Sequence, residues 1–542
     1  MKRALSILRI FLVGSLFLAP GTGLRAAEEP ANKPPVPLLA IEYVPLTQVL
    51  KQALTNPALA GALVGAKVLS LTSGRTLFAH NPDQLINPAS VTKMYTTAAA
   101  LSLLHPSHRF KTEIYTLKEP KRGVVKGPLY IKGYGDPFLV NERLTYLAEE
   151  LSAMGIKKID GPIILDDTSF DEENEGPGWA QDNSSRPYQA PMGALSLNFN
   201  SVAVRIFPGE KIGAPAVVEP LPESNHFKVE NKVITGRRTR GLRGETSGLG
   251  RKTRIKLRGQ IALNHPGLRY HLRVHQPTWY TGESFRMALK RAGIKVRKYI
   301  RRGKVPSYAD LLYTLRSPAL GELVRKVNKR SQNFMAEQLL KALGAAYYGE
   351  PASWTKGQKV MVRFLDEEVG IKPGTYVLHN GSGLNDVNRV TANQTCALLK
   401  TMWSRFDVRP DFLSSLAVAG SDGTVRRRFG QPGLQRTMRL KTGSLSGTRA
   451  LAGYVHTRGN ETFVFAITVA RYKGKSYEIN RVLDRFASAL ARSNADHQVL
   501  RETEVEPVPG PLEISTSDEA PFIVPEDATE GNEETDIPMG EP

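Results

Sequence analysis

The chain of 542 residues contains a single cysteine, Cys396, and this scarcity excludes several kinds of protein. One cysteine can form neither an intramolecular disulfide nor a thiolate metal cluster. No cysteine lies near the amino terminus, so a lipoprotein anchor, which needs a cysteine to acylate, is excluded as well. Cys396 falls in a helix-like run over residues 392–403, and we interpret it as an inert core residue.

Long apolar runs are also scarce, and only the amino-terminal one resembles a targeting segment. Residues 1–27 combine Lys2 and Arg3, an apolar run over 10–19 and small residues at the end, which is the form of a secretory signal. An uncleaved membrane anchor is the alternative, although the run is short for a bilayer span. Residues 28–40 read as a proline-rich linker. The sequence therefore predicts a periplasmic or secreted protein of a bacterial cell envelope.

Acidic residues are few outside the carboxy terminus. The formal net charge is +21, yet residues 501–542 hold 13 acidic residues and one basic residue, so residues 1–500 carry a net charge of +33. Residues 498–542, rich in Pro, Glu, Thr and Ser, are predicted to be a disordered acidic tail. The basic body suggests an anionic wall polymer or a membrane surface as a partner. No nucleic-acid-binding motif accompanies the charge, so nucleic acid is not an expected partner.

The most basic stretch covers residues 236–256, which are rich in glycine and include Arg237-Arg238-Thr239-Arg240. We favour a solvated loop here, and a patch that binds a polyanion is the alternative.

The order of predicted elements describes one α/β domain that an insertion interrupts. Strands are predicted near both ends of the chain, helices between them, and a last amphipathic helix over residues 477–492. From about residue 109 the pattern changes to short strands separated by Gly and Pro. We therefore assign residues 41–108 and 306–497 to one domain, and residues 109–305 to an inserted β-rich region of one or two domains.

The string Ser90-Val91-Thr92-Lys93 stands at the head of an apolar run, residues 94–104, that predicts a buried helix. Residues three apart share one helix face, so the serine hydroxyl and the lysine amine can touch. The hydroxyl becomes a useful nucleophile if burial or a second cation keeps the amine neutral, because a neutral amine can take its proton. Alone the string is weak, since roughly two such strings are expected by chance. A helix N-cap at Ser90 is the alternative.

Two further strings distinguish the Ser90-x-x-Lys93 string from a chance occurrence. Ser331-Gln332-Asn333 starts a predicted helix, and Lys441-Thr442-Gly443-Ser444 ends a predicted strand. Ser-x-x-Lys, a Ser-x-Asn-like string and Lys-Thr-Gly are together the signature of penicillin-binding proteins and β-lactamases. The chain thus resembles the penicillin-recognising serine peptidases. Within them it is similar to the class C low-molecular-weight penicillin-binding proteins, the D-alanyl-D-alanine carboxypeptidase/endopeptidase family.

The resemblance to that family runs from about residue 46 to residue 492. The long offset between Lys93 and Ser331 has room for inserted domains, which β-lactamases lack. Secondary strings also match: Gly-Asp-Pro at 135–137, Ala-Leu-Ser-Leu-Asn-Phe-Asn at 194–200, the helix start at 331–340 and Gly-Ser-Gly-Leu at 381–384. Departures are Asn380, where the family usually has Asp, and Tyr134, where it has an extra glycine. The implied fold is a β-lactamase/transpeptidase-like α/β domain, an antiparallel sheet flanked by helices, split by a large β-rich insertion.

The chemistry and the resemblance together assign catalytic roles. Ser90 would attack the substrate carbonyl and form an acyl-enzyme, with Lys93 as the general base. Ser331 would pass a proton between Lys93 and the leaving amine, and Asn333 would orient Lys93 and bind substrate backbone. Lys441 would depress the pKa of Lys93 and attract a substrate carboxylate.

The predicted substrate-binding residues are Thr442, Gly443, Ser444 and Asp166. Thr442 would stand beside the substrate carboxylate, and Gly443 would leave room for substrate along the strand edge. By resemblance, the backbone N–H groups of Ser90 and Ser444 form the oxyanion hole. Also by resemblance, an Asp of the insertion meets the amino group of diaminopimelate.

Two assignments in the insertion keep alternatives. Asp166 is the best match for the diaminopimelate contact, Asp167 stays open, and a turn cap at a strand end explains either residue as well. Ser196-Leu197-Asn198 is a second Ser-x-Asn string, which we place behind Ser331 because it lies in the β-rich insertion.

The expected function is a secreted serine DD-peptidase that acts on peptidoglycan peptides. It would cleave D-Ala-D-Ala as a carboxypeptidase, D-Ala-diaminopimelate cross-links as an endopeptidase, or both. β-Lactam antibiotics are expected as covalent inhibitors, and no metal or cofactor is needed. Two rivals are a β-lactamase, for which no Glu-x-x-Leu-Asn element is apparent, and an inactive scaffold that binds anionic wall polymer.

Overall fold

The computed structural model describes residues 43–179 and 184–500. The predicted signal and linker, and residues 501–542 of the predicted tail, lie outside the described residues. Within the described part, no helix is both long and apolar enough to cross a membrane.

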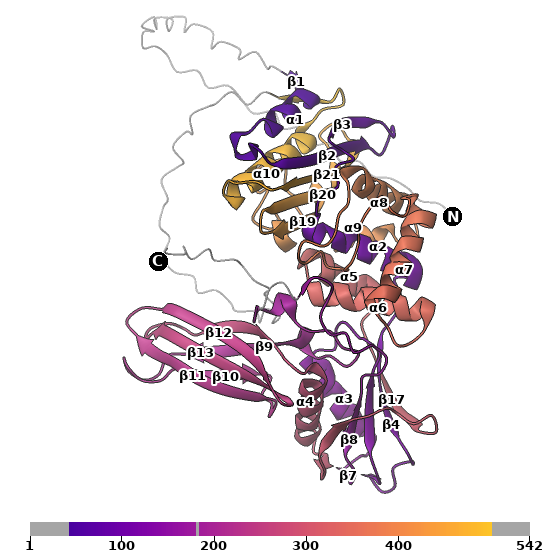
Figure 1. Cartoon of the computed structure of the whole chain (residues 1–542), viewed down its shortest axis with the longest axis vertical. Helices are drawn as coiled ribbons and strands as arrows, with labels where there is room; N and C mark the ends of the chain where they lie inside the picture. The colour runs from indigo at the N-terminus through magenta and orange to yellow at the C-terminus, as the bar shows by residue number, and fades with distance from the viewer. Residues whose placement is uncertain (1–42, 180–183, 501–542) are drawn as a thin grey trace, which may run out of the picture. The chain divides into compact units, whose positions relative to one another are not determined.

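A six-stranded antiparallel sheet combines segments from both ends of the chain (Figure 1). Its order is β18 (Ala417–Val418), β19 (Met438–Leu445), β20 (Thr448–His456), β21 (Thr462–Ala470), β2 (Leu63–Ser70) and β3 (Thr76–His80). The register of β2 on β21, from Leu63 opposite Ala470 to Ser70 opposite Phe463, joins the segment before the insertion to the segment after it. The insertion therefore interrupts this sheet in sequence but not in space.

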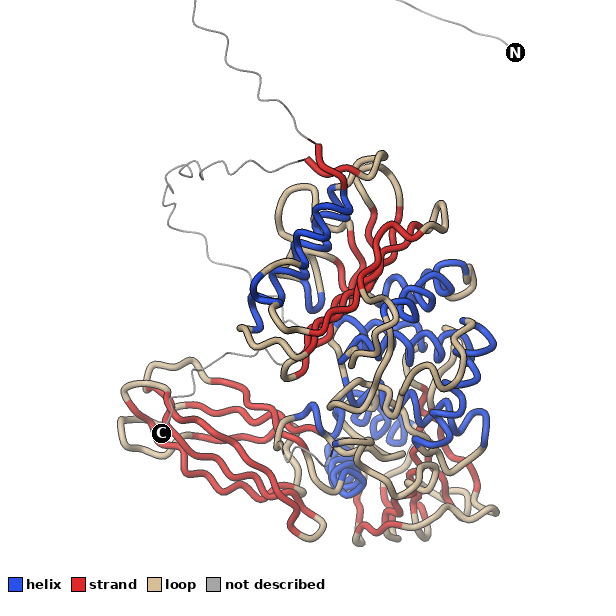
Figure 2. Tube along the Cα trace, turned by 45° about the horizontal axis from the view of Figure 1, so that its top comes forward, coloured by secondary structure: helices blue, strands red, loops and turns tan. Residues whose placement is uncertain are grey.

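Helices cover both faces of this sheet (Figure 2), so its central strands are buried on both sides. Along β20, Ala452 and Tyr454 face the core of the larger helical layer. Leu451 and Val455 face the core under α1 (Leu46–Leu54) and α10 (Ser476–Arg492). Because side chains alternate along a strand, the two cores need the nearly continuous apolar pattern that this segment has.

The larger helical layer is built around α2 (Thr92–Leu104), which is buried from Thr92 to Leu101. A helix that is buried on all sides needs neighbours on all sides, and α2 packs against several of the other helices. The other members are α5 (Leu320–Lys329), α6 (Asn333–Tyr348), α7 (Trp354–Phe364), α8 (Ala392–Ser404) and α9 (Arg409–Ser415).

The inserted region contains a mixed five-stranded sheet. Its order is β16 (Ile300–Arg302), β8 (Ile163–Asp166), β6 (Leu129–Gly133), β4 (Lys111–Thr116) and β17 (Asp310–Arg316). Because β17 pairs with β4, the predicted boundary at residue 305 is too early, and residues 310–316 belong to the inserted sheet. Two helices pack beside it, α3 (Asn141–Ala153) and α4 (Pro277–Arg291), and of these α3 was not predicted from the sequence.

Three smaller sheets complete the insertion. They consist of β5 (Val124–Val125), β7 (Lys158–Ile159) and β15 (Lys295–Val296); β9 (Ser201–Phe207), β10 (Val217–Leu221) and β14 (Leu268–Arg273); and β11 (Phe227–Gly236), β12 (Arg240–Leu249) and β13 (Lys252–Ala262). The solvated loop predicted over residues 236–256 is therefore wrong. β12 pairs with β13 along most of its length, so the backbone groups of this stretch are satisfied in a sheet.

The two ends of the described chain meet in a short ribbon. β1 (Tyr43–Pro45) pairs with β22 (Gln498–Leu500) in antiparallel register. Residues 498–500 thus form a strand rather than the start of the predicted disordered tail.

Candidate active site

Ser90 lies in a single 3-10 turn, η2 (Ala89–Val91), directly before α2. The Asn87 side-chain oxygen accepts a 2.8 Å hydrogen bond from the backbone N–H of Ala89. Ala89 has a φ of 48°, a left-handed conformation that is uncommon without glycine and is often found at functional sites. Helix capping does not explain Ser90, because the N-cap position of α2 is Val91 and its first turn has no side-chain cap.

Lys93 is the centre of the site. Its Nζ lies 2.9 Å from Ser90 Oγ, 2.7 Å from Asn333 Oδ1 and 2.7 Å from the carbonyl oxygen of Ser382. The side chain is completely buried. Burial, reinforced by the nearby charge of Lys441, holds the pKa of Lys93 well below its usual range, and the Glu337 carboxylate opposes this shift.

Ser331 and Asn333 stand at the start of α6. Ser331 has a left-handed φ of 55°, which turns the chain into the helix. The Gln332 side chain then caps the helix by accepting a 3.2 Å bond from the N–H of Phe334. Asn333 Nδ2 donates to the carbonyl oxygen of Tyr188, at 3.1 Å, so the inserted region orients this amide and turns its oxygen to Lys93.

Lys441 reaches the site from β19. Its Nζ donates to Ser331 Oγ and to the carbonyl oxygen of Thr442, each at 3.0 Å. Burial lowers the pKa of Lys441 to about 7. The structure thus brings the predicted acylation residues together as a trio, Ser90 with Lys93 and Asn333, and a pair, Ser331 with Lys441, which the charge of Lys441 couples to Lys93.

The outer edge of β19 is open beside this cluster. β18 pairs only with Arg439 and Leu440, so among the described strands none pairs with residues 441–445 on that edge. Thr442 Oγ1 lies on this stretch and donates a 2.8 Å bond to Thr424 Oγ1, and Ser444 is exposed. An extended peptide could add to such an edge through backbone hydrogen bonds.

The structure explains the glycine at position 443 differently from the prediction. A Cβ built on Gly443 would lie 2.5 Å from the carbonyl oxygen of Pro88 and 3.2 Å from the Ala89 Cβ. The glycine therefore lets β19 approach the turn that carries Ser90, and the space it leaves is filled by this chain.

Sequence reasoning assigned no role to Glu337 or Ser382, although both lie in strings that it quoted. The buried Glu337 carboxylate accepts bonds from the N–H groups of Gly381 and Ser382, at 3.0 and 2.8 Å, and from Trp354 Nε1 at 2.8 Å. It therefore holds the loop whose Ser382 carbonyl contacts Lys93. Thr424, the partner of Thr442, was also missed.

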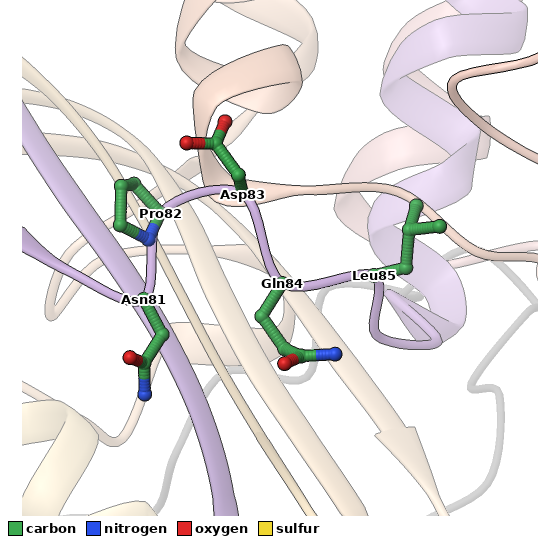
Figure 3. Close-up of a pocket in the computed structure, with 5 residues that line it drawn as sticks. All are labelled: Asn81, Pro82, Asp83, Gln84 and Leu85. Atoms are coloured by element: carbon green, nitrogen blue, oxygen red, sulfur yellow. The ribbon is translucent and has the colours of Figure 1, made fainter.

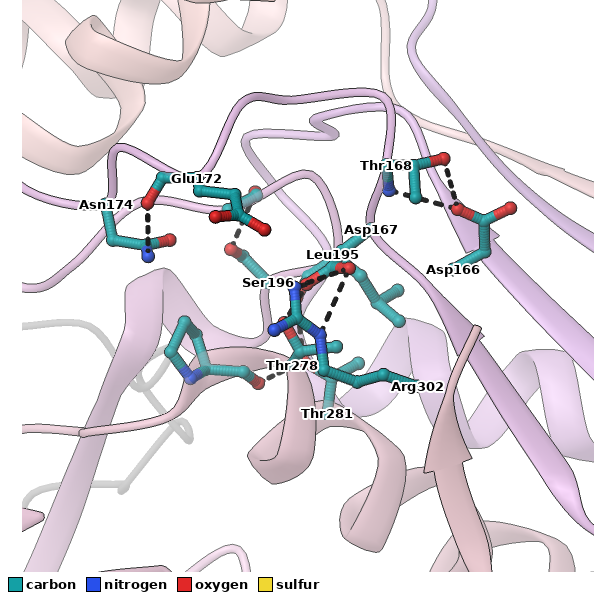
Figure 4. A network of polar contacts seen from close by, with 12 residues as sticks. Asp166, Asp167, Thr168, Glu172, Asn174, Leu195, Ser196, Thr278, Thr281 and Arg302 are labelled. Atoms are coloured by element: carbon teal, nitrogen blue, oxygen red, sulfur yellow. Dashed lines mark hydrogen bonds and ion pairs between the residues drawn. The ribbon is translucent and has the colours of Figure 1, made fainter. Parts of the chain in front are cut away.

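Asp166 and Asp167 lie in the insertion, where both carboxylates are engaged (Figure 4). Asp166 is completely buried; it accepts from the N–H and hydroxyl of Thr168 and, at 2.7 Å, from the N–H of Val305. Asp167 accepts from Thr278 and forms an ion pair with Arg302. These contacts fit the alternative interpretation, a cap at the end of a strand, and leave Asp166 no exposed surface for a substrate.

The second Ser-x-Asn string has a structural role. Ser196 Oγ donates to the carbonyl oxygen of Gly193 and accepts from Asn200 Nδ2, each at 2.9 Å. Asn198 bonds to the N–H of Asn141 and to the Tyr280 hydroxyl. No lysine amine takes part in these contacts, so the preference for Ser331 agrees with the geometry.

A surface depression of about 480 Å³ lies in the loop after β3, lined by residues 81–85 (Figure 3). It contains none of the predicted site residues. Among residues 43–179 and 184–500, no group of three His, Cys, Asp or Glu side chains is placed to hold a metal ion.

Comparison with known proteins identifies the family of the chain. Residues 46–490 match the model of the D-Ala-D-Ala carboxypeptidase 3 (S13) family. A D-alanyl-D-alanine carboxypeptidase from Actinomadura sp. (strain R39) is 30% identical over 435 residues, which cover 76% of this chain and 78% of that protein. The D-alanyl-D-alanine carboxypeptidase DacB of Haemophilus influenzae is 25% identical over 77% of this chain and 88% of its own length.

A solved structure supports the fold. The crystal structure of penicillin binding protein 4 (dacB) from Haemophilus influenzae superposes with a TM-score of 0.70 at 24% identity, covering 81% of this chain and 97% of the other. The predicted fold class is confirmed. The family match spans both parts of the large sheet together with the insertion. The chain therefore belongs to the S13 family of serine-type D-Ala-D-Ala carboxypeptidases.

Proposed function

We propose that Ser90 is the acylating nucleophile of this carboxypeptidase and that neutral Lys93 removes its proton. The surroundings of Lys93 Nζ carry the proposal. A neutral amine has two N–H groups and one lone pair, whereas the carbonyl oxygen of Ser382 and the amide oxygen of Asn333 can only accept. The two N–H groups are thereby used, and the lone pair is left for the hydroxyl of Ser90.

The other groups suit the remaining steps. Attack by Ser90 Oγ on the penultimate D-Ala carbonyl gives an acyl-enzyme, and the hydroxyl of Ser331, bonded to Lys441, can pass a proton to the leaving D-Ala amine. Lys441 and Thr442 would bind the substrate carboxylate, while the peptide pairs with the open edge of β19. The N–H groups of Ser90 and Ser444 would bind the oxyanion, each worth about 3–4 kcal/mol. Water then releases the acyl group.

Three more specific proposals accompany this mechanism. β-Lactams would acylate Ser90, which is supported by a solved structure of the Haemophilus influenzae protein complexed with a novel β-lactam. Cross-links from D-Ala to diaminopimelate would also be cleaved, because only the leaving amine differs. Residues 1–27 would direct the enzyme to the periplasm, where peptidoglycan peptides are accessible.

Covalent labelling with penicillin, read by intact mass and peptide mapping, tests the proposal. We expect one penicilloyl adduct, on Ser90, in the wild-type protein, and none in Ser90→Ala. Lys441→Ala should label far more slowly, which separates loss of the nucleophile from loss of the carboxylate partner. Assays on pentapeptide and on cross-linked dimers then separate carboxypeptidase from endopeptidase turnover. A folded wild-type protein that forms no adduct would refute Ser90 as the acylating residue and favour the wall-binding scaffold.

A further inference from the structure

The sheet of β11, β13 and β12 has two chemically different faces. Its inner face carries buried apolar residues, among them Val233, Ile255, Leu257 and Ile261, which belong to the hydrophobic core of the insertion. Its outer face carries the alternate residues, which are exposed or half-buried and mostly charged. We call this outer surface the basic face.

The basic face has a strong excess of cations. Its basic side chains are Lys228, Lys232, Arg240, Arg243, Lys252, Arg254, Lys256 and Arg258. Its acidic side chains are Glu230 and Glu245, which form ion pairs with Arg254 and Arg258, each at 3.2 Å. The remaining cations leave a net charge of +6 on this one surface.

The strand register places like charges directly opposite one another. Lys232 of β11 lies opposite Arg258 of β13, and Arg258 lies opposite Arg243 of β12. Opposite like charges destabilise a sheet, so an anion bound along this row, in addition to the carboxylate paired with Arg258, would stabilise it. No aromatic side chain belongs to the basic face, so stacking on bases or sugars is not available here. The chemistry fits an extended polyanion held by charge alone.

We propose that the basic face binds the chain's own acidic segment, residues 501–542. This segment holds 13 acidic residues and one basic residue, which complements the charge of the face. It begins directly after Leu500 of β22. Fully extended, its 42 residues span up to about 140–150 Å. A globular protein of this size typically has a radius of gyration of about 23 Å, so the segment is long enough to reach the sheet.

Covalent linkage makes this contact effective even when it is weak. A tethered segment experiences an effective concentration on the order of millimolar, so contacts that would be negligible between separate molecules become populated. Because the contact is electrostatic and exposed, salt weakens it over a Debye length of about 8–10 Å. The segment would then compete with external anionic polymers for the same surface.

Zero-length cross-linking of the full-length protein with a carbodiimide tests the contact directly. This reagent couples carboxylates to lysine amines that touch them. At low salt we expect intramolecular cross-links from residues 501–542 to Lys228, Lys232, Lys252 and Lys256, and few to the exposed Lys51, Lys295 and Lys298. About 0.5 M NaCl should remove them. Cross-links spread evenly over all exposed lysines would overturn the proposal, as would cross-links found only in dimers.

Competition with polyphosphate separates the chain's own segment from an external polymer. A full-length variant in which all 13 acidic residues of 501–542 are changed to amides should bind polyphosphate about 10-fold more tightly than wild type at low salt. Adding Lys232→Gln, Arg243→Gln and Arg258→Gln should abolish this gain.

The matched control removes the same charge elsewhere, by Arg297→Gln, Lys298→Gln and Arg301→Gln, and should keep the gain. Hydrolysis of D-Ala-D-Ala, expected to be unchanged in all variants, checks that they fold. If wild type and the amide variant bind polyphosphate equally well through Lys232, Arg243 and Arg258, the face is open to an external polymer and the proposal fails.

Discussion

The lysines of the active site and those of the basic face lie in opposite environments. Lys93 and Lys441 have no exposed surface, and burial lowers the pKa of both. Lys232 and Lys256 are exposed to water. The surroundings of a lysine, and not its residue type, therefore decide whether its amine can become neutral, as a general base must, or stays a fixed cation.

The two regions also differ in how their cations are held. Lys93 is fixed by three partners from three segments of the chain, the amide oxygen of Asn333, the carbonyl oxygen of Ser382 and the hydroxyl of Ser90, so its amine has one geometry. On the basic face, Arg258 and Glu245 make an ion pair in which both side chains are more than half exposed. Exposed pairs of this kind contribute about 0–1 kcal/mol and adapt easily. A reaction needs the first arrangement, whereas binding an extended polyanion is compatible with the second.

The largest expected effect comes from removing the buried base. Lys93→Met should lower kcat/KM for a D-Ala-D-Ala peptide by about 100- to 10,000-fold, because general-base catalysis contributes that much. Lys93→Arg should be equally impaired, since arginine keeps a charge and cannot accept the proton. Steady-state kinetics measure both.

Lys232→Met is the matched control on the basic face, where the same change should leave kcat/KM unaltered. Far-ultraviolet circular dichroism shows whether each variant is folded. Lys93 variants that are folded and retain most of the wild-type rate would contradict the assignment of Lys93 as the base.

Lys441 should make stability depend on pH. Its pKa is about 7 in the folded protein and near 10.4 when unfolded, so between these values the unfolded chain binds the additional proton. Stability therefore rises with pH across this window, by up to about 1.4 kcal/mol per unit and roughly 4–5 kcal/mol in total. Lys441→Met has no amine to bury, so it should be more stable than the wild-type protein at pH 7. This difference in the free energy of unfolding should shrink from pH 7 to pH 10 in chemical denaturation. A pH-independent difference between the two proteins would show that Lys441 stays charged when buried.

The acylation residues could be predicted because their residue types and spacing form short sequence motifs. Ser90 and Lys93 share one helix face, and Lys441-Thr442-Gly443 ends a strand whose pattern is plain. Glu337 and the Ser382 carbonyl could not be assigned in the same way, since a backbone carbonyl leaves no residue-type signal and a buried Glu contacts residues 44 and 45 positions away.

The fold was predictable where hydrophobic periodicity is regular and failed where it is not. β12 was not predicted because its glycines and arginines obscure the alternation of inward-facing and outward-facing side chains. Only the pairing of β12 with β13 shows this alternation. α3 could have been found, since Leu144, Leu147, Ala148 and Leu151 are buried at helical spacing. Asp166 and Asp167 could not be told apart, because adjacent residues differ only in the side to which they point.

Asp166 and Asp167 allow a buried carboxylate to be compared with a more exposed one. Asp166→Asn should lower the free energy of unfolding by about 1–3 kcal/mol, because a buried acceptor of three hydrogen bonds is disturbed. Asp167→Asn, which weakens an ion pair to a half-exposed Arg302, should cost about 0–1 kcal/mol. Urea denaturation measures both. If Asp166→Asn instead raised KM only for peptides with a free diaminopimelate amine, the substrate-binding interpretation would replace the structural one.

The smallest expected effect lies on the basic face. Lys232→Gln removes a cation opposite Arg258, so it should raise the free energy of unfolding by about 0.2–0.5 kcal/mol at low salt. At 1 M salt the Debye length falls to about 3 Å and the gain should vanish. The advantage of Lys441→Met at pH 7 should persist, because the cost of burying the Lys441 amine comes from desolvation, which salt does not screen. Bound acidic residues from 501–542 would already relieve the repulsion, so the gain should be larger when that segment is changed to amides. Lys298→Gln is the control, and a gain at Lys232 that ignores both salt and the acidic segment would show that lost charge is not its cause.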